Sequence, residues 1–271
     1  MLLAGVLMLI YQAVFSRDKL KIQVGDLWRV GLLGVIAIYL TNVCEFWGLQ
    51  FLTSFKTCFI YSLSPFVSAF LSYFLLKDRL TKKKWLGLAV GFAGFLPILL
   101  SQGGSEELSG HFFFFSWAEV TVMIAAVSSV YGWILLGQLI KSGYSPITVN
   151  GMSMVLGGVL ALVHSGFAEQ WEPIPVMADK YWDFGVCTLL LMVISNLLAY
   201  NLYGYLLKRF SPTYLSLAGF TTPMFSVFFG WIFLGEVASW TFYLSAAIVF
   251  VGLSLFHQEE LQTELQAPSQ T

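Results

Sequence analysis

Most of this chain consists of long apolar runs separated by short polar connections, and this alternation restricts what it can fold into. A helix needs about 20 apolar residues to cross the hydrocarbon core of a bilayer. The runs are continuous rather than alternating in polarity, which disfavours membrane strands. We therefore expect nine helical spans, at residues 1–16, 28–48, 55–76, 84–101, 113–140, 146–167, 183–207, 212–235 and 240–256.

The composition supports a polytopic, all-α transmembrane bundle. The chain is 58% hydrophobic and only 11% charged, whereas a soluble domain carries about 25% charged residues. The net charge of −1 disfavours nucleic acid as a partner. Cys44, Cys58 and Cys187 lie in apolar runs without metal-binding spacing, so we expect free thiols, no metal and no cofactor. The expected partners are the lipid bilayer and a small-molecule solute, and a homodimer is left open.

The positive charges predict the orientation of the spans. Twelve of the 14 Lys and Arg residues fall in or beside alternate connections, which places them on one side of the membrane: Arg17, Lys19, Lys21, Arg29, Lys77, Arg79, Lys82, Lys83, Lys84, Lys141, Lys208 and Arg209. Basic connections face the cytoplasm. We therefore expect the tail at residues 257–271 to be cytoplasmic, and Lys56 and Lys180 to lie towards the outer side.

Two stretches of the chain match each other at a constant spacing. "SLSPFVSAFLSYFLLKDRL" aligns with "TTPMFSVFFGWIFLGEVAS" when Pro65 is placed on Pro223, an offset of 158 residues (223 − 65). The same offset places Asp78 on Glu236 and Gly94 on Gly252. By the charge pattern, Asp78 lies at the cytoplasmic end of its span and Glu236 at the outer end. The chain therefore contains an inverted repeat, which is typical of secondary transporters.

The repeat predicts the domain organisation. We expect a first repeat at residues 1–101 with four helices, a second at 112–256 with five, and a tail at 257–271. The short first span, with its positive charges after the apolar run, is unlike a signal peptide. The deficit of one helix therefore points to a helix missing before it, through a late start codon or genuine loss.

These residues resemble a known family. A proline followed by an acid at the end of the span, then Thr or Ser and glycines, in both halves, is similar to the EamA domain of the drug/metabolite transporter superfamily. The resemblance covers essentially the whole chain and implies ten helices in two inverted five-helix halves, with a central cavity and both termini in the cytoplasm. The chain departs from the pattern in the missing first helix and in Asp78, where Glu is usual.

Charged residues within spans are costly and therefore candidates for function. Glu45 and Lys56 flank a short outer turn and lie at similar depth, so we expect them to pair across the hairpin or to flank the mouth of the substrate cavity. Glu119 lies about two turns inside its span without a sequence-local partner, and we expect it to face the cavity.

Polar and aromatic residues complete the candidate substrate site. Asn42 shares a helix face with Glu45, and Asn42 and Asn196 either join helices or bind ligand. The remaining candidates are aromatic: Trp47, Tyr61, Trp117, Tyr131 and Tyr200. Together with carboxylates they would suit a cationic or heteroaromatic solute, although aromatics near span ends also form interface belts. We interpret Pro65 and Pro223 as helix kinks that face the protein interior.

The inverted repeat makes a secondary transporter of a small organic metabolite the leading function. No Walker A run is present, so ATP is not expected to drive it directly, and no paired catalytic motif favours an enzyme. The stretch "TNVCEFWGLQFLTSFKTCFIYSLSPF" resembles transporters of S-adenosylmethionine and S-adenosylhomocysteine from obligate intracellular bacteria, which implies exchange of these two solutes across the cell inner membrane. An amino-acid or cationic drug/metabolite exporter of the EamA type remains the alternative. A channel and an intramembrane enzyme are weaker rivals.

Overall fold

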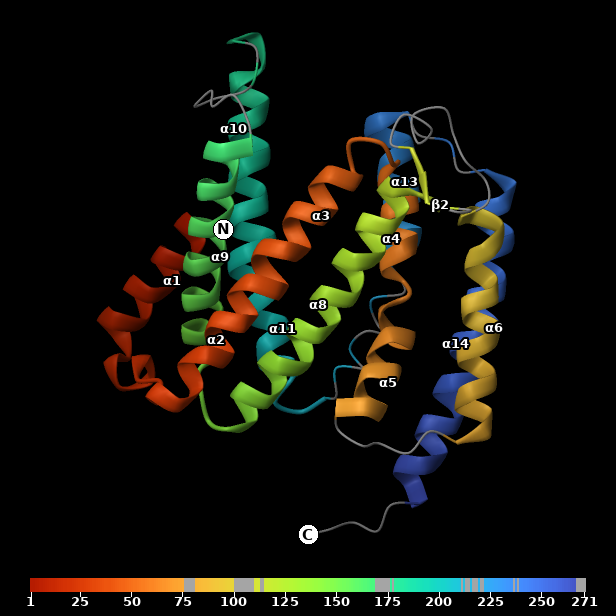
Figure 1. The fold of residues 1–271 in the computed structure, drawn as a ribbon, viewed down its shortest axis with the longest axis horizontal. Coiled ribbons are helices and arrows are strands. Elements are labelled where there is room, and N and C mark those ends of the chain that lie inside the picture. The colour runs from red at the N-terminus through yellow and green to blue at the C-terminus, as the bar shows by residue number, and fades with distance from the viewer. Residues whose placement is uncertain are drawn as a thin grey trace. The chain divides into compact units, whose positions relative to one another are not determined.

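The described part of the chain consists mainly of helices (Figure 1). They are seen in a computed structural model that describes residues 1–75, 81–99, 110–112, 115–168, 176, 178–210, 212, 215, 219, 222–235, 237 and 239–266. Apart from two two-residue strands, β1 (His111–Phe112) and β2 (Phe115–Ser116), the regular elements described are helical. The predicted all-α class is therefore confirmed.

The helices follow the predicted spans, most with small shifts at their ends, but the last helix continues to Gln266, through most of the predicted tail at residues 257–271. In the first part of the chain they are α1 (Leu2–Phe15), η1 (Arg17–Leu20), η2 (Val24–Asp26), α2 (Leu27–Leu33), η3 (Gly34–Leu40), α3 (Thr41–Gly48), α4 (Ser54–Tyr61), α5 (Ser64–Leu75) and α6 (Lys82–Leu99). The later helices are α8 (Trp117–Lys141), α9 (Pro146–Ala168), η4 (Ala178–Lys180), α10 (Tyr181–Leu190), η5 (Leu191–Ala199), α11 (Tyr200–Leu206), α13 (Thr222–Phe229), η7 (Gly230–Leu234) and α14 (Trp240–Gln266).

Five helices of the described chain are long and apolar enough to cross a membrane: Val24–Gly48, Lys56–Leu75, Trp117–Lys141, Pro146–Ala168 and Tyr181–Leu206. Three further apolar helices are shorter, among them α1 with 14 residues. The helix α6 has 18 residues but begins with three lysines, which lowers its hydropathy. The helices found at the predicted spans therefore differ in length more than the apolar character of the spans indicated.

The described residues separate into two compact units, and neither is one of the sequence halves. Unit 1 comprises Met1–Val43 and Ser128–Leu215, and unit 2 comprises Cys44–Val127 and Ser216–Thr271. Each unit takes one segment from each half of the chain, because helices pack on partners that are distant in sequence. We describe the two units separately.

In unit 1, α1 packs closely against α9 through small residues. A Cβ atom at Gly5 would lie 2.8 Å from the Gly151 carbonyl oxygen, and one at Gly158 would lie 2.9 Å from the Leu2 backbone nitrogen. Glycine is therefore needed at these positions, as is common where membrane helices approach closely. Because low residue numbers of α1 meet high numbers of α9, the two helices run antiparallel.

In unit 2, α6 and α14 form the equivalent antiparallel pair. A Cβ atom at Gly252 would lie 2.5 Å from the Gly91 nitrogen, and one at Gly94 would lie 2.8 Å from the Val249 nitrogen. Aromatic residues fill the adjoining core, including Phe59, Phe66, Phe95, Phe242 and Phe256, all buried. The Phe66 ring occupies the space that a side chain at Gly91 would need.

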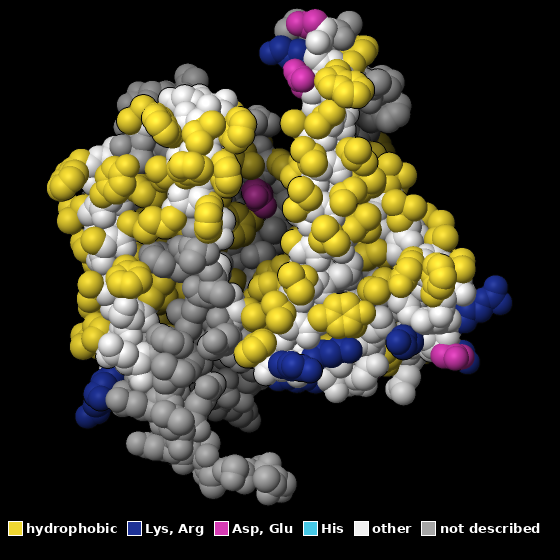
Figure 2. Space-filling model, turned by 180° about the vertical axis from the view of Figure 1, so that it is seen from behind, with side chains coloured by type: hydrophobic (Ala, Val, Ile, Leu, Met, Phe, Trp, Pro, Cys, Tyr) yellow, Lys and Arg dark blue, Asp and Glu magenta, His cyan; other side chains and the backbone are white. Residues whose placement is uncertain are grey.

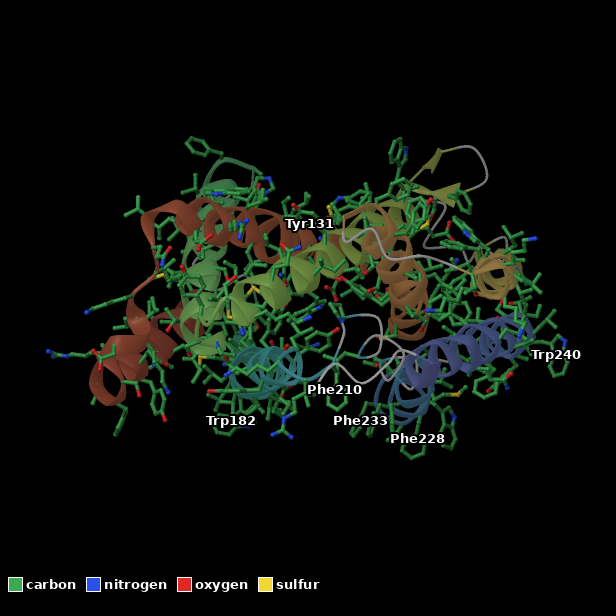
Figure 3. The ribbon with its side chains drawn as sticks, turned by 90° about the horizontal axis from the view of Figure 1, so that it is seen from below. Tyr131, Trp182, Phe210, Phe228, Phe233 and Trp240 are labelled. Atoms are coloured by element: carbon green, nitrogen blue, oxygen red, sulfur yellow. The ribbon has the colours of Figure 1, made fainter. Side chains whose placement is uncertain are left out.

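Apolar side chains cover the outer surfaces of the helices in both units (Figure 2), with Lys and Arg at the helix ends. In Figure 3, Trp182, Phe228, Phe233 and Trp240 project outward. Only 6% of the most apolar stretch of the helix Tyr181–Leu206 is buried. Soluble proteins do not expose apolar patches of this extent, so these faces are suited to lipid.

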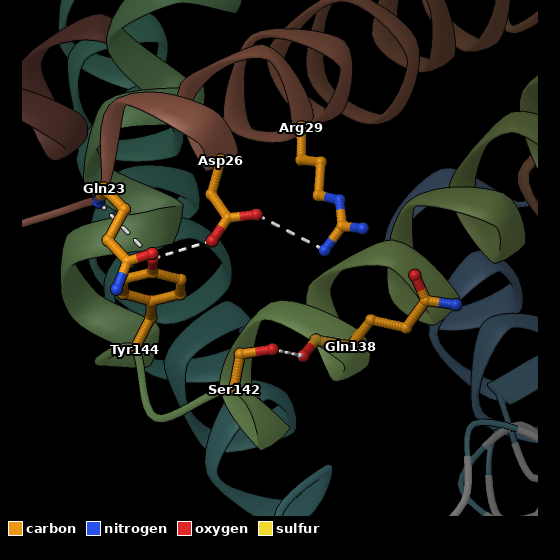
Figure 4. A network of polar contacts seen from close by, with 6 residues as sticks. All are labelled: Gln23, Asp26, Arg29, Gln138, Ser142 and Tyr144. Carbon is orange, nitrogen blue, oxygen red and sulfur yellow. Dashed lines mark hydrogen bonds and ion pairs between the residues drawn. The ribbon is translucent and has the colours of Figure 1, made fainter.

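A polar network ties together two connections of unit 1 (Figure 4). The Tyr144 hydroxyl donates to Asp26 Oδ2 at 2.8 Å, and Arg29 Nη1 lies 3.3 Å from Asp26 Oδ1. The Gln23 backbone N–H donates to the Tyr144 hydroxyl. The hydrogen bond to Asp26 raises the pKa of Tyr144. The network anchors the segment before α2 to the α8–α9 connection.

The two predicted kink prolines lie at helix starts. The helix α4 ends at Tyr61, and Pro65 is the second residue of the next helix, α5. Pro223 is likewise the second residue of α13. Proline is tolerated there because the first turn needs no backbone donor. The Ser64 hydroxyl donates to the Tyr61 carbonyl oxygen, so a side chain satisfies the acceptor that the break leaves free. Asp78 and Glu236 lie outside the described residues.

Candidate functional site

A buried ion pair lies at the centre of the candidate site in unit 2. Lys56 Nζ of α4 lies 2.8 Å from Glu119 Oε1 of α8, with side chains 4% and 0% exposed. Removing two charges from solvent is costly, and it is tolerated when the pair is close and further hydrogen bonds satisfy it. Glu45 was the expected partner of Lys56, and Glu119 was not predicted as one, because α8 brings Glu119 to the lysine from a distant part of the chain.

Glu119 is held by the start of its own helix. The Ser116 backbone N–H donates to Glu119 Oε2 at 2.8 Å, and the Glu119 N–H donates to Ser116 Oγ at 3.2 Å. This reciprocal pair is a capping box. The expectation that Glu119 lacks a sequence-local partner is therefore wrong. The Ser-x-x-Glu spacing in "SWAE" was the signal that could have revealed it.

Glu45 has a hydrogen-bond donor from the helix that carries Lys56. The Tyr61 hydroxyl donates to Glu45 Oε2 at 2.8 Å, which joins α3 to the end of α4. Both residues belong to unit 2. The structure therefore brings together two predicted candidates in a contact that the sequence did not indicate.

Two buried hydroxyl groups near the start of α4, Thr53 Oγ1 and Thr57 Oγ1, have no hydrogen-bond partner among the described residues. Thr53 is the N-cap residue of α4, with extended backbone, and Thr57 lies in the first turn, next to Lys56 in sequence. A buried polar group without a partner costs about 1–3 kcal/mol.

The other predicted residues are divided between the units. Trp47 and Trp117 belong to unit 2 and are exposed, as expected for interface aromatics. Asn42, Tyr131, Asn196 and Tyr200 belong to unit 1. Figure 3 labels Tyr131, which packs partly buried against the core of that unit.

Asn42 has a structural contact in unit 1. Its side-chain amide donates to the Ile38 carbonyl oxygen at 2.6 Å, and the Thr41 hydroxyl donates to the Ile36 carbonyl at 3.0 Å. Both acceptors lie in η3, a π-helical segment. Both bonds lie within the one helix Val24–Gly48 and stabilise its irregular segment.

Apolar helices long enough to span a bilayer and a buried, hydrogen-bonded charge pair define a polytopic membrane protein with a polar site inside its helices. The sequence profile of the EamA-like transporter family matches residues 1–100 and 116–257. The chain belongs to the EamA-like transporter family.

Several relatives are similar over nearly the whole chain. The S-adenosylmethionine/S-adenosylhomocysteine transporter of Chlamydia muridarum is 38% identical and aligns with 97% of this chain and 82% of its own length. The transporter of the same description from Chlamydia trachomatis serovar L2 is also 38% identical, with 97% and 80% covered. A solved crystal structure matches with a TM-score of 0.66 at 16% identity, covering 97% of this chain and 86% of that one. This last match supports the fold alone.

Proposed function

We propose that this protein exchanges S-adenosylmethionine for S-adenosylhomocysteine across the cytoplasmic membrane of a bacterium. The observation that carries the proposal is the 38% identity to the Chlamydia transporters over 97% of the chain. Both solutes contain an adenosine and an α-amino-acid group, and S-adenosylmethionine has a sulfonium as well. A transporter of such solutes needs groups that replace the water around several charges.

The charged residues of unit 2 have the chemistry for the charged end of these solutes. Lys56 can bind the carboxylate, and Glu119 or Glu45 can bind the ammonium or the sulfonium. Without solute, Lys56 and Glu119 neutralise each other at 2.8 Å. A zwitterion offers each of them a replacement counter-ion, so the pair can separate without leaving a buried charge alone. Thr53, at the N-cap of α4, and Thr57, in its first turn, add unsatisfied hydroxyl oxygens.

We also propose that the chain comprises two inverted repeats, at residues 1–101 and 112–256, with a tail at 257–271. The antiparallel pair α6 and α14 supports this. Under the offset of 158, the contact between Gly91 and Gly252 becomes the contact between Val249 and Gly94, since 91 + 158 = 249 and 252 − 158 = 94; both contacts are present. Such an exchange is what a two-fold axis between inverted repeats produces. The match of the family profile to residues 1–100 and 116–257 gives further support.

The proposed orientation rests on the distribution of positive charge. The basic connections lie in the cytoplasm, and the tail at residues 257–271 lies there as well. Pro65 and Pro223 keep their proposed role as breaks in equivalent spans. We propose that lipid surrounds the exposed apolar faces. A second copy of the chain remains a candidate partner.

Counterflow in proteoliposomes tests the proposed function. Purified protein is reconstituted into vesicles loaded with unlabelled S-adenosylhomocysteine, and the entry of labelled S-adenosylmethionine is followed. We expect saturable uptake that disappears in vesicles without internal solute. Free adenosine or methionine inside should not replace the loaded solute. Uptake that does not depend on internal solute would rule out exchange.

The same vesicles distinguish the alternative function. The carboxylates and aromatics would also suit an amino-acid or cationic drug/metabolite exporter. A panel of loaded amino acids and organic cations, each tested for trans-stimulation, separates these classes. Stimulation by several unrelated cations but not by S-adenosylhomocysteine would assign the chain to that alternative.

A further inference from the structure

Three basic segments of unit 1 meet at one end of its helices, around the start of α9. The Thr148 hydroxyl of α9 donates to the Lys19 carbonyl oxygen at 2.9 Å. A Cβ atom at Gly204 of α11 would lie 2.9 Å from the Pro146 side chain, and α8 ends at Lys141, five residues before Pro146. The exposed basic side chains of this end are Arg17, Lys19, Lys21, Lys141, Lys208 and Arg209.

The charge of this end is strongly positive. With Arg29, seven basic side chains face two acidic ones, Asp18 and Asp26, which leaves a net charge of +5. Asp26 is engaged by Arg29 at 3.3 Å and by the Tyr144 hydroxyl. Figure 2 shows Lys and Arg side chains gathered at this end of the unit. Such an end attracts anions.

Apolar side chains are exposed among these charges. Val24 and Trp28, in the segment between α1 and α2, are 85% and 63% exposed. The Arg29 guanidinium lies 5.6 Å from the centre of the Trp28 ring, and the Lys208 ammonium lies 5.1 Å from that of Tyr205. Exposed aromatic and apolar side chains next to basic ones suit a membrane–water interface, where each kind of group meets a favourable environment.

The segment at residues 16–29 is held in place on the unit. Besides the hydrogen bond from Thr148, the Gln23 backbone N–H donates to the Tyr144 hydroxyl at 3.4 Å. Ile22 packs partly buried against the core of unit 1. The fold therefore presents the basic and apolar side chains of this segment in a fixed arrangement, which lowers the entropy lost when a partner binds.

We propose that this basic end of unit 1 binds the phosphate groups of anionic phospholipids, with residues 16–29 lying in the membrane–water interface. Lys and Arg form charge-assisted hydrogen bonds with phosphate oxygens, and the acyl chains cover Val24 and Trp28. A soluble anion would satisfy the charges and leave these apolar side chains in water. The inference goes beyond solute exchange and does not depend on which solute is carried.

Thermal unfolding of the purified protein in detergent tests the binding. Phosphatidylglycerol is added stepwise, and the concentration that gives half of the maximal rise in melting temperature is measured, because a ligand of the folded state stabilises it. We expect phosphatidylglycerol to act at lower concentration than phosphatidylcholine, and inorganic phosphate at equal ionic strength to have little effect. Equal action of the two lipids, or the same rise with inorganic phosphate alone, would overturn the proposal.

Charge variants locate the binding surface. Lys208→Gln and Lys21→Gln should each raise the half-maximal phosphatidylglycerol concentration about fivefold, and the double variant about 25-fold, as expected for basic residues near an anionic surface. Lys180→Gln is the matched control, because Lys180 and Lys208 lie beyond opposite ends of the same helix, Tyr181–Leu206, and both are exposed. An unchanged double variant, or an equal effect of Lys180→Gln, would contradict the assignment.

A nitroxide label at Val24→Cys, in a protein without Cys44, Cys58 and Cys187, tests the interfacial placement. In vesicles that contain phosphatidylglycerol, we expect the label to collide more with oxygen, which concentrates in lipid, than with a water-soluble nickel complex. Predominant collision with nickel would overturn the placement.

The two proposals fail separately. Preference for phosphatidylglycerol in a protein that does not exchange S-adenosylmethionine would overturn the proposed function alone. Exchange by a protein without that preference would overturn the lipid surface alone.

Discussion

At the scale of single residues, the environment of each charged side chain depends on its partners in the fold rather than on its position in the span. Glu119 has a capping box at its own helix start and a lysine from another helix. Glu45 has a tyrosine hydroxyl. A carboxylate that looks alone in the sequence can therefore have close partners in the fold.

Breaking the Lys56–Glu119 pair should destabilise the protein, and removing both charges should largely restore it. Lys56→Met leaves Glu119 buried and unpaired, which costs about 3–5 kcal/mol. The double variant Lys56→Met, Glu119→Gln has no buried charge, and glutamine can still close the capping box. Thermal unfolding in detergent measures this difference. We expect the double variant to be stable yet inactive in exchange; active exchange would show that the pair is structural only.

Glu45→Gln should reduce exchange while the protein remains folded. Glutamine keeps an oxygen that accepts from the Tyr61 hydroxyl, so the link between α3 and α4 survives. The negative charge for the ammonium or sulfonium is lost, and we expect about a tenfold or greater rise in the half-saturating concentration, since hydrogen bonds to charged groups contribute about 1.5–3 kcal/mol. Tyr61→Phe is the companion variant, because it keeps the charge and removes only the hydroxyl. Wild-type kinetics in Glu45→Gln would exclude Glu45 from the site.

At the scale of elements, close helix pairs depend on glycine where the backbones approach. The α6–α14 pair has no room for a Cβ atom at Gly252, since it would lie 2.5 Å from the Gly91 nitrogen. The offset of 158 residues matched Gly94 with Gly252 and so indicated that these two spans are equivalent, but it could not show that they touch.

Gly252→Ala should therefore destabilise the protein by about 1–3 kcal/mol or more, the range for overpacking of a filled interior. Gly185→Ala is the matched control, because Gly185 is also helical and a Cβ atom added there would meet no atom within 4 Å outside its own helix. The control should be neutral or stabilising by up to about 1 kcal/mol, since alanine favours helix over glycine. The melting temperatures of the two variants in detergent decide the matter, and equal values would contradict the packing role.

At the scale of the whole molecule, the chain is a membrane transporter by family and by its apolar helices. Its compact units cut across the sequence halves. The composition was sufficient to predict the class of protein. The placement of Lys and Arg in alternate connections predicts an orientation that a labelling experiment can examine.

The proposed orientation places Lys180 and the tail residue Gln258 on opposite sides of the membrane. Single-cysteine variants Lys180→Cys and Gln258→Cys, made after replacing Cys44, Cys58 and Cys187 by serine or alanine, can be labelled in intact cells with a membrane-impermeant maleimide. We expect labelling at position 180 without permeabilisation and at position 258 only after it. Labelling of both positions in intact cells would refute the proposed orientation.

The sequence by itself determined the class of protein, the approximate helices and the family, because span length, charge distribution and the repeat are local or additive properties of the chain. It also singled out the charged residues within the spans. Only the tertiary structure decided which of them meet. Lys56 and Glu119 are 63 residues apart (119 − 56), and their contact depends on how α8 packs beside α4.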